Sequence, residues 1–305
     1  MQAFSIYYFI VAHTTSVKKF NLLKPLALFL CAFCVSGLLS TTITIKSSGA
    51  IPLLSNGPKE FTLRAEFYTS YNKSSMERKN NIKIASKKIN DYFLDVGYEF
   101  SFNKVVGART EKNGFKQAKI IVNGKFVDGI GGGVCQVSTT LYNAVLLAGL
   151  KVTEYHAHSL PVSYVAPSFD AMVNSGYADL KFVNTTSMPI IIKSTADGER
   201  IKISIYGEKM KEKYVRESII TGEVVAPKEE ILIDEKLEYP DLLEGEQKVI
   251  NYSKNGYYSK GRLIKYENGK MICVVELRKD KYNATKGLII EGKAKKEQNL
   301  NLEAI

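Results

Sequence analysis

A run of glycines near the middle of the chain limits the fold more than any other feature. Residues 129–133 read Gly-Ile-Gly-Gly-Gly, and a long stretch of apolar and small residues follows. Glycine tolerates positive φ and lets a second backbone approach closely, so the run predicts a tight turn. The apolar residues after it recur at helical spacing, which predicts a helix over residues 136–150. Cys135 therefore stands where a tight turn enters a helix.

The start of a helix favours a reactive cysteine. Unpaired N–H groups and the helix dipole stabilise an anion there, which lowers the pKa of a thiol and increases its thiolate fraction. We therefore predict that Cys135 is a nucleophile. The same N–H groups could hold a developing oxyanion, and the hydroxyls of residues 138–140 could line the site, although capping or solvent exposure fits them equally well. The predicted oxyanion and substrate-binding residues are Gly132, Gly133, Gln136 and Ser138.

A base is expected beside such a thiol. The segment Tyr-His-Ala-His-Ser contains the only histidines after the glycine run, His156 and His158. In an extended segment residues two apart share a face, so both imidazoles could point into one site. A carboxylate usually orients the base. Asp170 and Asp179 follow in the sequence, and we predict Asp170.

Each of these features also has another interpretation. Free cysteines are often buried and inert, so Cys135 could be part of the core. It could form a disulfide with Cys273, although Cys273 is predicted to lie buried in a later strand. The glycines could cradle a phosphate, but the lysine of a P-loop is missing. Cys135 with the two histidines could bind zinc, but the spacing is irregular. We expect neither a metal ion nor a cofactor.

The remaining patterns predict an α+β fold, which consists of a mostly antiparallel sheet with the cysteine-bearing helix, followed by a small all-β module. Residues 76–93 have helical periodicity, and residues 200–206 alternate as a half-buried strand does. Asn-Gly pairs at 123–124 and 268–269 predict hairpins. The predicted domain boundaries are 1–25, 26–45, 46–59, 60–207, 208–293 and 294–305.

The N-terminal region suggests export. Residues 26–45 carry no charge and have the length of a membrane helix. Lys18, Lys19 and Lys24 precede them, which places the N-terminus in the cytoplasm by the positive-inside rule. We predict an uncleaved single-pass anchor in the cell membrane, a linker at 46–59 and an extracellular remainder that faces the cell wall. The alternatives are a cleaved signal peptide and a buried core helix.

The charge balance favours an anionic partner. Lysine and arginine number 42 and aspartate and glutamate 31, for a net charge of +11. No nucleic-acid-binding motif accompanies this excess, so no nucleic-acid partner is expected. Arg109, Lys181 and Lys193 are candidate contacts for substrate carboxylates.

Four blocks of sequence then identify a family. They are Phe-Ser-Phe-Asn-Lys-Val-Val-Gly at 100–107, Gly-Ile-Gly-Gly-Gly-Val-Cys-Gln-Val-Ser-Thr-Thr-Leu-Tyr-Asn at 129–143, His-Ser-Leu-Pro-Val-Ser-Tyr-Val at 158–165 and Tyr-Ala-Asp-Leu-Lys-Phe at 177–182. Together they resemble the VanW domain of the bacterial envelope over about residues 60–195. The C-terminal part is similar to the five-glycine wall-associated module, through Gly261, Asn268-Gly269-Lys270 and Gly287.

The resemblance implies an activity. Some clostridial members look like L,D-transpeptidases, which cross-link peptidoglycan stem peptides through a catalytic cysteine. It implies that Cys135 is the nucleophile and His158 the base, because His158 stands in the family's His-Ser block whereas His156 matches a more variable position. One departure is clear: the widespread L,D-transpeptidase domain has histidine and glycine directly before its cysteine, whereas this chain has Val134.

We therefore expect a cell-wall L,D-transpeptidase that joins the third residues of two stem peptides through a cysteine thioester. With water as the acceptor the same residues would make an L,D-carboxypeptidase or a cysteine hydrolase. The alternative from another class is a non-catalytic peptidoglycan-binding protein, whose contacts would be Tyr252, Tyr257, Tyr258 and Tyr266.

Overall fold

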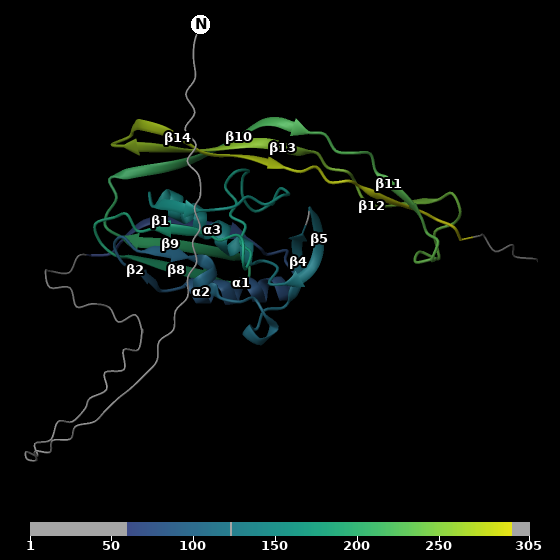
Figure 1. Cartoon of the computed structure of the whole chain (residues 1–305), viewed down its shortest axis with the longest axis horizontal. Coiled ribbons are helices and arrows are strands. Elements are labelled where there is room, and N and C mark those ends of the chain that lie inside the picture. The colour runs from purple at the N-terminus through teal and green to yellow at the C-terminus, as the bar shows by residue number, and fades with distance from the viewer. Residues whose placement is uncertain (1–59, 123, 295–305) are drawn as a thin grey trace, which may run out of the picture. The chain divides into compact units, whose positions relative to one another are not determined.

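The computed structural model describes residues 60–122 and 124–294 (Figure 1). The predicted segments 1–25, 26–45 and 46–59 lie outside this range, as does the tail after residue 294. Among the described residues no helix has both the length and the apolar composition needed to cross a membrane. The prediction of a single-pass membrane protein is corrected accordingly. The described residues belong to one compact unit.

The fold class differs from the predicted α+β fold. The described residues form fifteen strands but only three α-helices and one 3-10 helix, so the protein is mostly β. The prediction underestimated the strand content because the region after residue 207 forms long strands, two of them thirteen residues in length. The strands assemble into five sheets rather than one main sheet and one small module.

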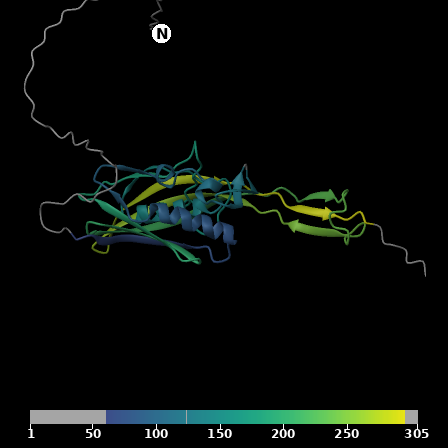
Figure 2. The ribbon, with the colours of Figure 1, turned by 90° about the horizontal axis from the view of Figure 1, so that it is seen from below.

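The first sheet supports the two long helices. Its antiparallel order is β1-β9-β8-β2. Alternate isoleucines of β9 are fully buried, as the sequence periodicity predicted. Helix α1 packs on β8 and helix α3 on β1 and β9, and the helices contact each other (Figures 1 and 2). The bounds are β1 Thr62–Ser70, α1 Met76–Ile89, β2 Tyr92–Leu94, α3 Val134–Leu147, β8 Ile190–Ala196 and β9 Arg200–Gly207.

Helix α1 is shorter than predicted. Ser75 caps its start by accepting a hydrogen bond from the backbone N–H of Arg78. The helix ends at Ile89 because Asn90 is extended and Asp91 has φ 59°, which turns the chain into β2. The apolar residues at 92 and 93 that suggested a longer helix belong to that strand.

Smaller elements complete the N-terminal part. Strands β3, β7 and β6 form one antiparallel sheet, and β4 pairs with β5 in the predicted hairpin. The bounds are β3 Glu99–Ser101, α2 Phe102–Val106, the 3-10 helix η1 Glu111–Asn113, β4 Gln117–Val122, β5 Lys125–Ile130, β6 Lys151–Glu154 and β7 Lys181–Val183.

The C-terminal part, residues 208–294, is called the β module below. Strands β10, β13 and β14 form one antiparallel sheet, and β11, β15 and β12 form another in which β11 and β15 are parallel. The predicted hairpin at Asn268 and Gly269 joins β13 to β14, and both residues have positive φ. The bounds are β10 Glu212–Val224, β11 Glu230–Ile233, β12 Gln247–Asn251, β13 Gly256–Glu267, β14 Lys270–Tyr282 and β15 Leu288–Glu291.

Candidate active site

The glycine turn places Cys135 through close packing. Gly131 has φ 90° and Gly133, which caps α3, has φ 109°. A Cβ atom on Gly132 would lie 2.7 Å from the carbonyl oxygen of Lys119, and one on Gly133 would lie 3.0 Å from the side chain of Ile82. The turn is thus packed between α1 and β4, so Gly132 and Gly133 are needed for the shape of the turn.

Helix α3 is almost wholly buried, and Cys135 is the exception near its start. Every residue from Val134 to Leu146 is buried apart from Cys135, which is partly exposed. Cys135 is a free thiol, as is the exposed Cys273 of β14. The expectation that Cys273 lies in the core is therefore wrong, and the structure does not pair it with Cys135.

Cys135, His158 and Asp170 lie in one line of contacts. The Cys135 thiol interacts with the side chain of His158, and its Sγ lies 3.4 Å from the carbonyl oxygen of Val173. The Nδ1 atom of His158 lies 2.7 Å from Oδ2 of Asp170, and the backbone N–H of His158 donates to the same oxygen at 2.6 Å. A carboxylate on Nδ1 leaves Nε2 as the ring nitrogen for the thiol. His158 is 6% exposed and Asp170 1%, so the contact is shielded from water.

The pKa values of these groups shift in the directions that favour a charged pair. Burial raises the pKa of Cys135, but the interactions with His158, together with smaller effects of Val173 and Arg109, lower it overall. Burial lowers the pKa of His158, but Asp170 and Cys135 outweigh burial and raise it to about 9. Burial likewise raises the pKa of Asp170, whereas His158 and Arg278 bring it below its ordinary value. The site therefore favours thiolate and imidazolium near neutral pH.

The polar side of α3 holds the segment that carries Asp170. Ser138 donates to the carbonyl of Ala171 at 2.6 Å, and Thr139 accepts from the N–H of Ala171 at 2.9 Å. Asn143 donates to the carbonyl of Phe169 at 2.7 Å. All three α3 side chains are fully buried. Their hydrogen bonds satisfy backbone groups on both sides of Asp170 and thereby fix its position along the helix.

The other predicted site residues occupy different places. The imidazole of His156 contacts Glu154 at 3.0 Å and is partly exposed, so the two histidines do not share one site. The side chain of Gln136 links α3 to β1 and α1, and its N–H donates to the carbonyl of Gly133 at 3.0 Å. Asp179 accepts from Ser101 at 2.5 Å and from the N–H of Asn103 at 2.8 Å, which caps α2.

Two further side chains approach Cys135. Tyr164 interacts with Cys135 and Thr139, and burial raises the pKa of its hydroxyl. Arg109 places its positive charge close to Cys135, while its guanidinium donates to Ser175 at 2.8 Å and to Asn103 at 2.5 Å. Of the three basic residues suggested by the sequence, Arg109 is the one whose charge acts on the thiol. Lys181 pairs with Glu154, and Lys193 with Asp91.

The second oxygen of Asp170 is held from the β module. Tyr282 donates to Oδ1 at 2.5 Å, and Arg278 reaches the same oxygen at 3.4 Å and the carbonyl of Asp170 at 2.6 Å. Sequence reasoning missed both residues, because β14 has only the pattern of an ordinary strand. It also missed Tyr164, although Tyr164 lies inside one of the four family blocks.

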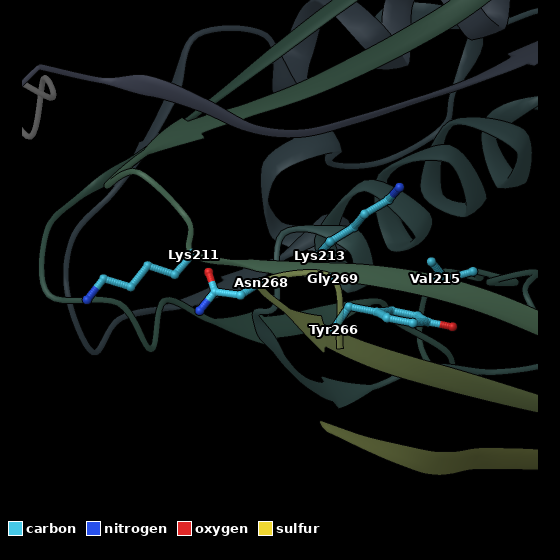
Figure 3. Close-up of a pocket in the computed structure, with 6 residues that line it drawn as sticks. All are labelled: Lys211, Lys213, Val215, Tyr266, Asn268 and Gly269. Carbon is cyan, nitrogen blue, oxygen red and sulfur yellow. The ribbon is translucent and has the colours of Figure 1, made fainter. Parts of the chain in front are cut away.

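A separate hollow lies on the β module. It measures about 550 Å³ and is lined by Lys211, Lys213, Val215, Tyr266, Asn268 and Gly269 (Figure 3). Lys211 lies directly before β10, and the others come from β10 and from the β13–β14 hairpin. None of the residues that line the hollow belongs to the Cys135 site.

Comparison with known proteins supports the family resemblance. Residues 77–206 match the family model described as VanW like protein. Protein YoaR of Bacillus subtilis is 41% identical over 141 residues, which are 46% of this chain and 46% of YoaR. The vancomycin B-type resistance protein VanW of Enterococcus faecalis is 29% identical over 153 residues, which are 45% of this chain and 56% of that protein. The chain thus spans about half the length of these relatives.

Two solved structures match part of the chain. The G5 domain of an IgA1 protease is matched over 29% of this chain and 100% of its own length, with 22% identity and a TM-score of 0.18. The structure HP0197-G5 is matched over 27% of this chain and 100% of its own length, with 13% identity and a TM-score of 0.15. Similarity at this level supports no conclusion about function.

Proposed function

Taking residues 77–206 as a VanW-like domain, we propose that the protein is a cysteine-dependent acyltransferase that acts on peptidoglycan stem peptides. The relatives indicate a cell-wall-associated protein. The observation that carries the enzymatic proposal is the contact chain from Cys135 through His158 to Asp170. A nucleophile, a base and an orienting carboxylate in this order form the arrangement used for acyl transfer on several unrelated folds.

The first half of the reaction forms a thioester. The Cys135 thiolate attacks the carbonyl of the third stem residue, and the carbonyl electrons move to oxygen. In this proposal the backbone N–H of Cys135, in the first turn of α3, stabilises that oxyanion. The tetrahedral intermediate collapses, the bond to the terminal D-Ala breaks, and the His158 imidazolium gives its Nε2 proton to the leaving amine.

The second half transfers the acyl group. His158 is now neutral and takes a proton from the side-chain amine of a diamino acid on a neighbouring stem. The amine attacks the thioester, the carbon–sulfur bond breaks, and the thiolate–imidazolium pair is restored. Asp170 keeps Nδ1 as the donor throughout, so Nε2 faces the reacting groups. The product is a cross-link between two third residues.

The test uses the full-length protein with disaccharide tetrapeptides and mass spectrometry. We expect a dimer that has lost one D-Ala, formed by the wild type and by the Cys273→Ala control but not by Cys135→Ala. Loss of D-Ala without a dimer would change the proposal to an L,D-carboxypeptidase. No product, together with slow alkylation of Cys135, would overturn the enzymatic proposal.

A second candidate is a peptidoglycan-binding protein without catalysis. Tyr252 is 67% exposed and Tyr258 44%, and Tyr266 lines the hollow with Lys211 and Lys213 (Figure 3). Exposed aromatic and basic side chains suit sugar rings and stem carboxylates. Sedimentation with purified peptidoglycan tests this candidate: retention that needs Tyr252 and Tyr258 but not Cys135 would support it.

A further inference from the structure

The two oxygens of the Asp170 carboxylate are held by different parts of the chain. Oδ2 accepts from the backbone N–H and from Nδ1 of His158, both within the VanW-like domain. Oδ1 accepts from Tyr282 and Arg278, both on β14 of the β module. Arg278 also donates to the backbone carbonyl of Asp170. Removing the β module would thus leave the carboxylate held on one side only.

The two donors on β14 are themselves fixed. The side chain of Arg278 is 2% exposed, and its Nε donates to Asp280 at 2.7 Å. The guanidinium lies over the ring of Tyr155 at 4.8 Å. Tyr282 is 1% exposed, packs on Tyr257 with ring centroids 5.1 Å apart and accepts from the N–H of Ser168 at 2.8 Å. Because both donor side chains are fixed by these contacts, they can bind the Asp170 carboxylate in only one position.

The surrounding backbone joins the same two parts. Gly261 of β13 lies against the carbonyl of Ser168, where a Cβ atom would be 2.7 Å from the oxygen. The N–H of Asn283 donates to the carbonyl of Ser159 at 2.8 Å, and the Tyr155 hydroxyl donates to the carbonyl of Leu277 at 3.2 Å. These contacts flank His158 and Asp170 along the chain, so β13 and β14 pack on the loop that carries both.

We propose that the β module completes the active site: Arg278 and Tyr282 are positioning residues that hold Asp170 in the rotamer that orients His158. This inference rests on the proposed cysteine chemistry and assigns the module a part in it besides any wall binding. A carboxylate with Oδ1 unheld can rotate about its side-chain bonds and lose alignment with the imidazole. The imidazolium and then the thiolate would lose stabilisation.

The experiment measures the reactivity of Cys135 directly, without relying on cross-linking. Full-length protein is alkylated with iodoacetamide from pH 4 to 10, and peptide mass spectrometry follows Cys135 separately from the other cysteines. The variants are Tyr282→Phe, which keeps the ring packed on Tyr257, and Arg278→Gln. The matched controls are Tyr98→Phe, an exposed tyrosine directly before β3, and Lys279→Gln, the exposed neighbour of Arg278. Thermal unfolding is recorded for all of them.

The titratable groups that interact with Asp170 are His158, Arg278, Tyr282, Tyr142, Tyr164 and Tyr257. In Tyr282→Phe and Arg278→Gln we expect the acid limb of the Cys135 alkylation profile to move up by about one pH unit. Alkylation on that limb should therefore be about tenfold slower than in the wild type. Asp170→Asn should shift it in the same direction, and Arg278→Lys should restore part of the loss. Both controls should match the wild type.

Each other outcome overturns a different statement. Slow alkylation of wild-type Cys135 at neutral pH would overturn the proposed function. Fast wild-type alkylation with unchanged limbs in both β14 variants would overturn the positioning role alone. An acid limb that moves down in Arg278→Gln would also overturn it, because Arg278 would then act only as a charge that opposes the imidazolium. If Arg278→Gln does not fold, Tyr282→Phe decides, since it removes a single oxygen atom.

Discussion

Gly261 of β13 lies directly against the backbone carbonyl of Ser168, two residues before Asp170. A Cβ atom at Gly261 would lie 2.7 Å from that oxygen and 3.0 Å from the Ser168 Cβ. Since backbone cannot move aside as a flexible side chain can, this contact sets how closely the β module approaches the site.

Gly261→Ala should destabilise the protein by about 1–3 kcal/mol, because the added methyl group must push two backbones apart. Urea unfolding measures the change. The control is Gly222→Ala on the neighbouring strand β10, where the new Cβ would meet only a Tyr258 ring carbon at 3.5 Å, an ordinary contact. Equal stability of the two variants would contradict the close approach.

The pH dependence of the reaction should follow the thiolate–imidazolium pair. We expect a bell-shaped kcat/KM profile whose acid limb lies below the ordinary pKa of a cysteine and whose basic limb lies near the His158 value of about 9. Activity rises as the pair gains its thiolate and falls as His158 loses its proton. A profile that only begins to rise above pH 8 would show that His158 does not lower the pKa of the Cys135 thiol.

Substitution should distinguish the two histidines. His158→Gln removes the hydrogen bond and the charge that lower the pKa of Cys135, so the acid limb of Cys135 alkylation should move up, and cross-linking should fall by about 10²–10⁴-fold. His156→Gln removes a contact with Glu154 and should leave both measurements near wild type. The reverse order of effects would assign the base to His156.

Arg109 is expected to contact a carboxylate of the stem peptide. Its hydrogen-bond partners Asn103 and Ser175 are neutral, and its charge lies near Cys135. Arg109→Gln should therefore raise KM for the tetrapeptide and raise the pKa of Cys135, because both anions lose a positive neighbour. Steady-state kinetics and alkylation measure the two effects. Arg200→Gln, which removes a charge stacked on the exposed Tyr68, serves as the control and should change neither.

Ser138 can be tested as a structural residue. Its hydroxyl donates to the carbonyl of Ala171 at 2.6 Å, so Ser138→Ala leaves a buried acceptor without that donor and should cost about 1–3 kcal/mol of unfolding free energy. Ser70→Ala, at an exposed serine of β1, should cost much less. If Ser138→Ala instead raises KM with no loss of stability, the hydroxyl binds substrate, as the sequence suggested.

Local signals in the sequence located Cys135 and the side chains that lie in contact with it. The glycine run predicted the turn into α3, and Asp170, rather than Asp179, is the carboxylate that contacts His158. The suggestion that both histidines share one face was wrong because it assumed an extended segment. Strand β6 ends at Glu154, before either histidine, so spacing by two no longer sets their direction.

The long-range part of the site could not be predicted. Arg278 and Tyr282 reach Asp170 across 108 and 112 residues. Nothing in the alternating pattern of β14 marks two of its side chains as partners of a distant carboxylate. The predicted fold class was wrong for a related reason. Segments that suggested short strands separated by glycines form the long antiparallel sheet of β10, β13 and β14.

The place of β14 in the chain has a consequence for the timing of assembly. Ribosomes make proteins from the N-terminus, so Cys135, His158 and Asp170 all exist before Arg278 and Tyr282 have been added. A nascent or broken chain that stops before β14 carries the thiol but lacks two donors of its carboxylate. If the β module completes the site as proposed above, full nucleophilicity arises only in finished molecules, and an incomplete chain would react more slowly with acyl groups.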